Sequence, residues 1–229
     1  MATNIPAPTT LLRWGSRLAP ELLQFRLPRG GASFALTFDD GPHPAHTPRI
    51  LELLGRSRVR ATFFLQGELC ERHPDLVRRV IAEGHRVGSH GWDHRSARRL
   101  DAAEALLQAT RCHELLCQLA GQPLPRLHRP PYGEMTLGAL IRLAREGFRL
   151  VFWSYDSRDS FVTDAASLQE RFETQPPKPG DIILLHEDYP LTVSALPSLL
   201  EALQVRATLG DVDGQSCETH EAGHAPACP

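Results

Sequence analysis

The chain has 229 residues, of which 41% are hydrophobic, with 17 glycines and 19 prolines, a composition typical of one globular domain with a buried core. A formal net charge of −2 excludes the global basic field that holds nucleic acid. No apolar run reaches the roughly 18 residues of a membrane span, and the N-terminus lacks the order of a secretory signal. Five cysteines, an odd number, fit a reducing compartment, so we expect a cytoplasmic protein.

Strand-like and helix-like segments alternate through the middle of the chain. Some strand segments are apolar without interruption, which is typical of parallel strands that are covered on both faces. The alternation predicts an α/β fold with about seven parallel strands, but periodicity leaves open whether the sheet closes into a barrel. The predicted strands are residues 33–38, 61–65, 86–89, 127–129, 148–153, 181–186 and 205–209, and the predicted helices are residues 48–54, 74–83, 101–120, 136–146, 164–173 and 193–204.

We expect a single domain over residues 31–209, between an N-terminal extension (1–30) and a polar, disordered tail (210–229). The extension contains leucines and a tryptophan at roughly helical spacing, which favours an amphipathic helix packed on the core over one on a membrane surface. The tail has a C-x2-H-x3-H-x3-C arrangement, but without surrounding apolar residues an unstructured tail is favoured over adventitious metal binding. Its ligand-like residues are Cys217, His220, His224 and Cys228.

Two carboxylates, Asp39 and Asp40, follow the first predicted strand. Parallel α/β folds place their active sites at the carboxyl ends of their strands, so this position indicates a site. If both side chains stay ionised, a positive group must lie nearby, and a metal ion would satisfy that requirement. The competing interpretation is an ordinary Asx-type turn before Pro42.

Two histidines four residues apart, His90 and His94, follow the strand predicted at residues 86–89. At this spacing two imidazoles can converge on one cation, and either Asp39 or Asp40 can supply the third ligand of an open catalytic site. Each histidine alone would be interpreted as a satisfied or exposed side chain. The pair, with a carboxylate pair at another strand end, predicts one divalent metal, most readily zinc, with iron, cobalt and nickel left open.

A third set of polar residues is spread along the chain. His186 ends an apolar strand, where it is either a core histidine or a proton donor with a pKa near neutrality. Arg129 precedes two prolines and is placed to brace a carboxylate with two hydrogen bonds. Asp156 or Asp159 could orient His186 through its second ring nitrogen, although either could equally form a surface ion pair.

These motifs, in this order, resemble the polysaccharide deacetylases with NodB homology, also called carbohydrate esterase family 4, from about Phe34 to Leu203. The resemblance implies an incomplete (β/α) barrel, formed here by the 31–209 domain. It also implies a metal-dependent hydrolase that removes N-acetyl groups from N-acetylglucosamine units of an oligo- or polysaccharide and releases acetate. The ion is expected to be zinc, with cobalt or nickel as alternatives.

The resemblance further assigns a role to each matching residue. Asp39 is the expected catalytic base and His186 the general acid; Arg129 orients the base and Asp159 tethers the acid. The Tyr132 N–H helps to hold the oxyanion, Leu185 lines the pocket for the acetyl methyl group, and Asp40, His90 and His94 are the metal ligands. Ser160 stands where the family has a tryptophan.

Two other functions remain open from the sequence. One is a carbohydrate-binding protein that keeps the barrel without catalysis, which we expect to lack Asp39 or His186; both are present. The other is a hydrolase acting on an O-acetyl ester or a different amide, since a metal site alone does not identify the substrate. For the deacetylase that the resemblance implies, the expected partner is an N-acetylated oligo- or polysaccharide and not a nucleic acid.

Overall fold

The computed structural model describes residues 21–28 and 33–216, a part of the chain that contains nine strands and seven α-helices. The strands are β1 (Leu23–Gln24), β2 (Ser33–Gly41), β3 (Thr62–Leu65), β4 (Arg86–Ser89), β5 (Leu127–His128), β6 (Arg149–Val151), β7 (Tyr155–Asp156), β8 (Ile182–His186) and β9 (Thr208–Gly210). The helices are α2 (Thr47–Arg56), α3 (Gly67–Arg72), α4 (Pro74–Ala82), α5 (Ala102–Ala120), α6 (Leu137–Arg145), α7 (Ala165–Thr174) and α8 (Pro190–Gln204), with a 3-10 turn η1 (Pro131–Gly133).

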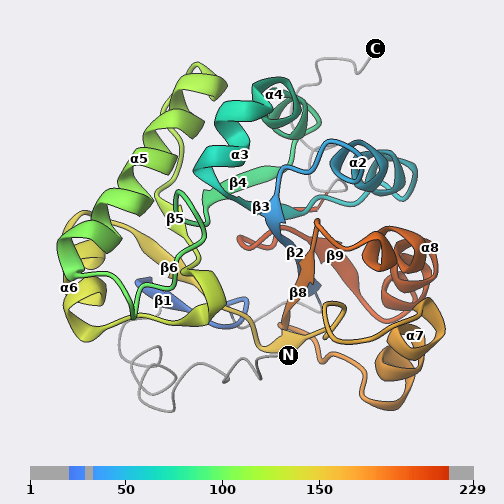
Figure 1. The fold of residues 1–229 in the computed structure, drawn as a ribbon. Coiled ribbons are helices and arrows are strands. Elements are labelled where there is room, and N and C mark those ends of the chain that lie inside the picture. The colour runs from blue at the N-terminus through green and yellow to red at the C-terminus, as the bar shows by residue number, and fades with distance from the viewer. Residues whose placement is uncertain (1–20, 29–32, 217–229) are drawn as a thin grey trace.

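The strands form one curved sheet in which all paired strands are parallel (Figure 1). The hydrogen-bonded path runs β1-β6-β5-β4-β3-β2-β8-β7, and β9 pairs with β2 outside this path. Its two ends, β1 and β7, are not neighbours in the sheet, and near the opening Arg26 forms an isolated bridge with Asp181. The sheet is therefore an incomplete (β/α) barrel, which confirms the predicted fold.

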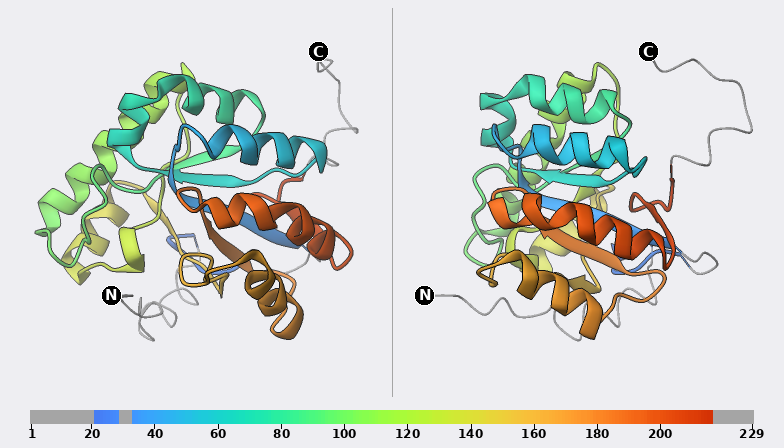
Figure 2. Two further views of the ribbon diagram at one scale, coloured as in Figure 1. Left: turned by 45° about the vertical axis from the view of Figure 1, so that its right-hand side comes forward. Right: turned by 90° about the vertical axis from the view of Figure 1, so that its right-hand side faces the viewer.

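The helices lie around the outside of the curved sheet (Figures 1 and 2). Local signals define several of their ends: the Asp101 carboxylate accepts the N–H groups of Ala103 and Glu104 at the start of α5, and Gly121 ends that helix in the left-handed conformation. Proline at the first turn of α8 starts that helix at Pro190, before the predicted start at residue 193.

Side chains of β2 point alternately to the two faces of the sheet and belong to two core clusters, an outer one that includes the helices and an inner one on the opposite face. Phe34, Leu36 and Phe38 pack into the large cluster that includes residues of the helices, whereas Ala35 belongs to a smaller cluster on the other face of the sheet. Burial of each large apolar side chain contributes about 1.5–3 kcal/mol. Because successive residues of a strand face opposite sides, Asp39 shares the inner face with Ala35. The inner face of β2 therefore ends in a carboxylate.

The structure corrects the predicted elements at several points. The strands β1 and β7, of two residues each, and helix α3 were not predicted, and the last strand is Thr208–Gly210 in place of 205–209. Leu23, one of the leucines assigned to the amphipathic helix, lies in β1, where pairing with β6 determines its conformation. Phe25 stacks on Phe152 with ring centroids 4.6 Å apart, and Val212 is fully buried in the inner cluster. The packed unit thus extends past both predicted boundaries, 31 and 209.

Residues 1–20, which hold most of the predicted amphipathic segment, lie outside the described residues, as do Cys217, His220, His224 and Cys228. Among the described helices, none combines the length and apolar character needed to cross a membrane.

Candidate active site

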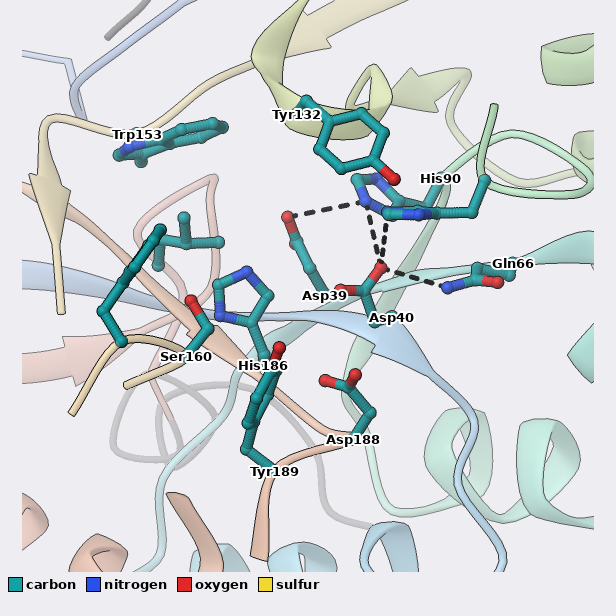
Figure 3. Close-up of a pocket in the computed structure, with 13 residues that line it drawn as sticks. Asp39, Asp40, Gln66, His90, Tyr132, Trp153, Ser160, His186, Asp188 and Tyr189 are labelled. Carbon is teal, nitrogen blue, oxygen red and sulfur yellow. Dashed lines mark hydrogen bonds and ion pairs between the residues drawn. The ribbon is translucent and has the colours of Figure 1, made fainter. Parts of the chain in front are cut away.

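Five predicted site residues meet at the carboxyl ends of neighbouring strands. Asp39 and Asp40 lie near the end of β2, His90 and Arg129 follow β4 and β5, and His186 ends β8. In the parallel register Asp39 pairs with His186, so these ends share one edge of the sheet. All of these residues except Arg129, which is fully buried, line a cleft of about 360 Å³ (Figure 3).

The adjacent carboxylates of Asp39 and Asp40 point in different directions because the backbone changes conformation between them. Asp40 has φ 69°, in the left-handed region, and the register between β2 and β3 shifts between Asp39 and Gly41. A Cβ on Gly41 would overlap the buried Glu187 carboxyl, so no other residue fits this position without displacing it. The local sequence Asp-Asp-Gly therefore has a steric reason as well as a chemical one.

Asp39 is held by a buried guanidinium. Arg129 donates from Nη1 to Asp39 Oδ1 at 2.7 Å and to Thr37 Oγ1 at 2.8 Å. Its Nε and Nη2 donate to the carbonyls of Val151 and Phe152 at 3.0 and 3.1 Å. Burial raises the pKa of Asp39 to about 6, while Arg129 acts in the opposite direction. Asp39 is thus ionised at neutral pH in a fixed orientation, as a general base requires.

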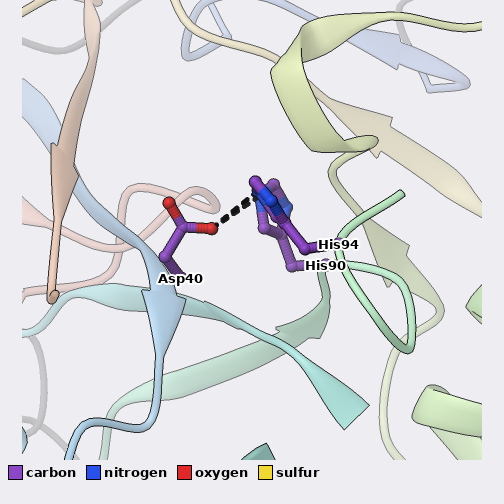
Figure 4. A group of neighbouring side chains, drawn as sticks. All are labelled: Asp40, His90 and His94. Carbon is purple, nitrogen blue, oxygen red and sulfur yellow. Dashed lines mark ion pairs between the residues drawn. The ribbon is translucent and has the colours of Figure 1, made fainter. Parts of the chain in front are cut away.

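Asp40, His90 and His94 each offer a ligand atom within 4.8 Å of the other two (Figure 4). Asp40 Oδ1 lies 2.8 Å from His94 Nε2 and 3.5 Å from His90 Nε2. Two imidazoles and one carboxylate are suitable donors for zinc, and for iron, cobalt or nickel, in a site that keeps open positions.

The surroundings of these three residues also suit a cation. His90 Nδ1 lies 2.8 Å from the carbonyl oxygen of Arg129, which leaves Nε2 facing the cluster. Burial lowers the pKa of His90 well below its usual value, so the imidazole is neutral, the form that binds a metal. Burial disfavours the charge on Asp40, yet the hydrogen bond with His94 and the nearby imidazoles keep its pKa below the usual range. The residues present therefore fit one divalent ion.

Asp159 is the buried partner of His186. It accepts hydrogen bonds from the His186 backbone N–H at 2.7 Å and from Thr192 Oγ1 at 2.6 Å, and its Oδ1 lies 2.7 Å from His186 Nδ1. Burial opposes a charged His186, but Asp159 outweighs burial and raises the pKa of His186 to about 10. The imidazole is protonated at neutral pH, with Nε2 free to donate, whereas Asp156 instead accepts the N–H of Arg158.

Two further residues were predicted to lie at the cleft, and the structure places only one of them there. Tyr132 lines it, has φ 61° in η1, and places its ring 4.7 Å from that of His94. The prediction that Leu185 lines the pocket is wrong: Leu185 packs in the outer core cluster, and Leu184 lines the cleft. Since side chains alternate along β8, Leu184 is the residue that shares the inner face with His186.

Sequence reasoning missed several residues that line the cleft or lie directly behind its wall. Gln66 Nε2 donates to Asp40 Oδ1 at 3.0 Å, and Trp153 contributes an apolar wall. Gln66 directly follows the predicted strand 61–65 and Trp153 ends the predicted strand 148–153, so the rule that found Asp39 would also have found them. Asp188 and Tyr189 line the cleft directly after the His186 motif, and burial together with Asp40 raises the pKa of Asp188 to about 6.

Glu187 is fully buried beside the base. Its backbone N–H donates to the carbonyl of Asp39 at 2.9 Å, and its Oε2 accepts the Thr47 hydroxyl. Its Oε1 has no partner within the described ranges, and burial raises its pKa to about 8. Glu187 is therefore largely a neutral carboxylic acid near pH 7, packed under the Asp39–Gly41 turn.

Ser160 lines the cleft next to Phe161, and its backbone N–H donates to Asp159 Oδ1 at 3.0 Å. The tether of His186 is thus complete with serine at this position, because the bond to Asp159 uses the main chain.

Comparison with known proteins agrees with this arrangement. Residues 27–151 match the family model of polysaccharide deacetylases. A chitooligosaccharide deacetylase of Bradyrhizobium sp. (strain ANU 289) is 38% identical over 194 residues, covering 77% of this chain and 87% of that protein. A peptidoglycan-N-acetylglucosamine deacetylase of Bacillus cereus is 38% identical over 162 residues, covering 71% of this chain and 58% of that protein.

The fold is also similar to solved structures of such enzymes. The crystal structure of the Bc1960 peptidoglycan N-acetylglucosamine deacetylase has a TM-score of 0.76 and 35% identity, covering 81% of this chain and 88% of that one. Sequence and fold agree, and the chain belongs to the polysaccharide deacetylase family of hydrolases.

Proposed function

We propose that the protein removes N-acetyl groups from N-acetylglucosamine units of an oligo- or polysaccharide and releases acetate. The observation that carries the proposal is the pairing of a buried base, Asp39 with Arg129, and a buried acid, His186 with Asp159, in one cleft beside three metal-ligand side chains. Sugar binding alone does not require an ionised carboxylate and a protonated imidazole at the same edge of the sheet.

Asp39 accepts the proton of the attacking water in this proposal. Its negative charge is retained at neutral pH, and Arg129 fixes the carboxylate through Oδ1, which leaves Oδ2 toward the cleft. Because Arg129 also holds two main-chain carbonyls, the pair cannot rotate as a unit. Proton transfer to a carboxylate oriented in this way contributes typically 10²–10⁴-fold to rate.

His186 donates the second proton to the departing sugar amine. Asp159 forms a hydrogen bond with Nδ1 of His186 and keeps the imidazole charged, so Nε2 of His186 is the proton donor. The Tyr132 backbone N–H contributes to holding the negative charge that develops on the acetyl oxygen. Leu184 and Trp153 supply apolar wall beside these groups, suited to the acetyl methyl group.

Asp40, His90 and His94 would hold a divalent ion, for which zinc is our first assignment and cobalt or nickel the alternatives. When bound, such an ion supplies Lewis-acid stabilisation of negative charge during amide hydrolysis. Elemental analysis of the purified protein is expected to give one equivalent per chain, and less in the His90→Ala variant. Equal metal content in both proteins would contradict this ligand set.

The activity is tested by acetate release from N-acetylglucosamine oligomers, peptidoglycan fragments, O-acetylated sugars and non-sugar acetamides. We expect release from the N-acetylated sugars. Release only from O-acetyl esters or non-sugar amides would favour the other hydrolase, and sugar binding without any release would favour the binding protein.

We further propose that this activity is intracellular. The three described cysteines, Cys70, Cys112 and Cys117, are free thiols, which suits a reducing compartment. Cell fractionation tests this, since recovery mainly outside the cytoplasm would contradict it.

A further inference from the structure

The carboxylates at the cleft differ in whether they have a partner. Asp39 is paired with Arg129 at 2.7 Å, Asp40 with His94 at 2.8 Å, and the deeper Asp159 with His186 at 2.7 Å. Asp188 also lines the cleft, and Figure 3 draws its carboxylate on the side of the cleft that holds Asp40. Within residues 21–28 and 33–216, Asp188 forms no ion pair and no hydrogen bond with another side chain. It is therefore an acidic group of the cleft that is not engaged in an ion pair.

The rest of the cleft wall includes the charged His186, whose charge acts on Asp188 but which is already paired with Asp159. Among the described lining residues of the cleft there is no lysine or arginine, since Arg129 lies buried behind Asp39. Beside Asp188 stands Tyr189, whose ring lies 5.9 Å from that of His186. A carboxylate next to an aromatic ring attracts an ammonium group, through charge and through the face of the ring. The Asp188 carboxylate repels the carboxylates of an anionic glycan.

We propose that Asp188 recognises the ammonium group of a glucosamine unit, so that the preferred substrate is a sugar chain that is already partly deacetylated. This inference rests on the proposed deacetylase function. Hydrolysis converts a neutral acetamide and water into acetate and an amine, which takes up a proton at or below neutral pH. Each turnover therefore creates a cation with which Asp188 can pair, next to the units that still carry acetyl groups.

The test compares two glucosamine tetramers, one fully N-acetylated and one with a single N-acetyl group. For the wild type we expect a higher kcat/KM for acetate release on the charged tetramer at low salt. In Asp188→Asn the ratio of the two values is expected to fall about 5-fold, near the upper range for a partly exposed ion pair. Added salt should lower the wild-type ratio and leave that of the variant nearly unchanged, because salt screens exposed charges.

Asp75→Asn is the matched control, since it makes the same change on α4 at a side chain that is 95% exposed and does not line the cleft. It is expected to keep the wild-type ratio. An equal loss on both tetramers in Asp188→Asn, or no change in the ratio, would overturn the proposal. Loss of bound metal in Asp188→Asn would also overturn it, because the carboxylate would then act on the ion.

A calorimetric titration with the fully deacetylated tetramer measures recognition without turnover. The wild type should bind it more tightly than Asp188→Asn by a similar factor, and equal affinities would refute the role of Asp188. If the wild type released no acetate from either tetramer, the deacetylase function would fail, while this titration would still decide whether Asp188 binds the ammonium group.

Discussion

Replacement of Arg129 tests the link between packing and catalysis at this site. Its guanidinium is fully buried and donates to Asp39, to Thr37 and to the carbonyls of Val151 and Phe152. Its carbon Cζ also lies 4.2 Å from the centre of the Phe64 ring. Truncation would leave a buried carboxylate without its cation and two carbonyls without donors.

The expected cost follows from these contacts. Removing one partner of a buried ion pair costs about 3–5 kcal/mol, and each carbonyl left unsatisfied adds about 1–3 kcal/mol unless water enters. We therefore expect Arg129→Ala to lose at least about 3 kcal/mol of unfolding free energy in urea. Arg129→Lys keeps the charge but not the planar fork, so a smaller loss is expected.

Arg129→Lys also separates the electrostatic role from the structural one. Since Arg129 lowers the pKa of Asp39 against the effect of burial, a weaker contact should raise that pKa. The acidic limb of the kcat/KM profile for acetate release should then move to higher pH in the lysine variant. A folded Arg129→Lys protein with an unshifted acidic limb would refute the assignment of that limb to Asp39, and an Arg129→Ala protein as stable as wild type would refute the packing argument.

Three further changes have defined outcomes. Gly41→Ala should cost about 1–3 kcal/mol in urea unfolding because its Cβ overlaps the Glu187 carboxyl, and combining it with Glu187→Ala should cost less than the sum of the two single changes. Burial lowers the pKa of His85 to about 4, and its Nδ1 accepts the Ala61 N–H at 3.2 Å, so the neutral imidazole stabilises the fold above pH 6.5 and this stabilisation is lost as the pH falls toward 4. His85→Asn should therefore reduce the difference in unfolding free energy between pH 7 and pH 5 by about 2 kcal/mol. An unaltered difference would exclude His85 as its source. Ser160→Trp should raise kcat if space for an indole exists beside His186, whereas failure to fold would show that Trp153 or Phe161 already occupies that space.

Much of the site could be predicted from the sequence because its chemistry lies at strand ends. Asp39 and His186 lie at the ends of largely apolar strands and His90 directly follows the strand Arg86–Ser89, and parallel strands bring such ends to one edge. The pairing of Arg129 with Asp39 depends on the order of β5 and β2 in the sheet, which the family resemblance implied and the local pattern did not contain.

Other features could not be predicted from local patterns. Strands of two residues, such as β1 and β7, are too short for a period to appear, and their conformation depends on pairing with β6 and β8. In β8 every residue is buried, so hydrophobicity did not distinguish the face of Leu184 from that of Leu185. Had the period of two been counted back from His186, Leu184 would have been placed in the cleft.

The most direct test of the account is acetate release by Asp39→Asn, with the metal content measured on the same protein. The substitution spares Asp40, His90 and His94 and removes only the proton-accepting carboxylate. We expect kcat/KM to fall by at least about 100-fold, the lower range for a positioned general base, with metal content close to that of the wild type. Near wild-type acetate release from this variant would contradict the central claim that Asp39 is the base of a deacetylase.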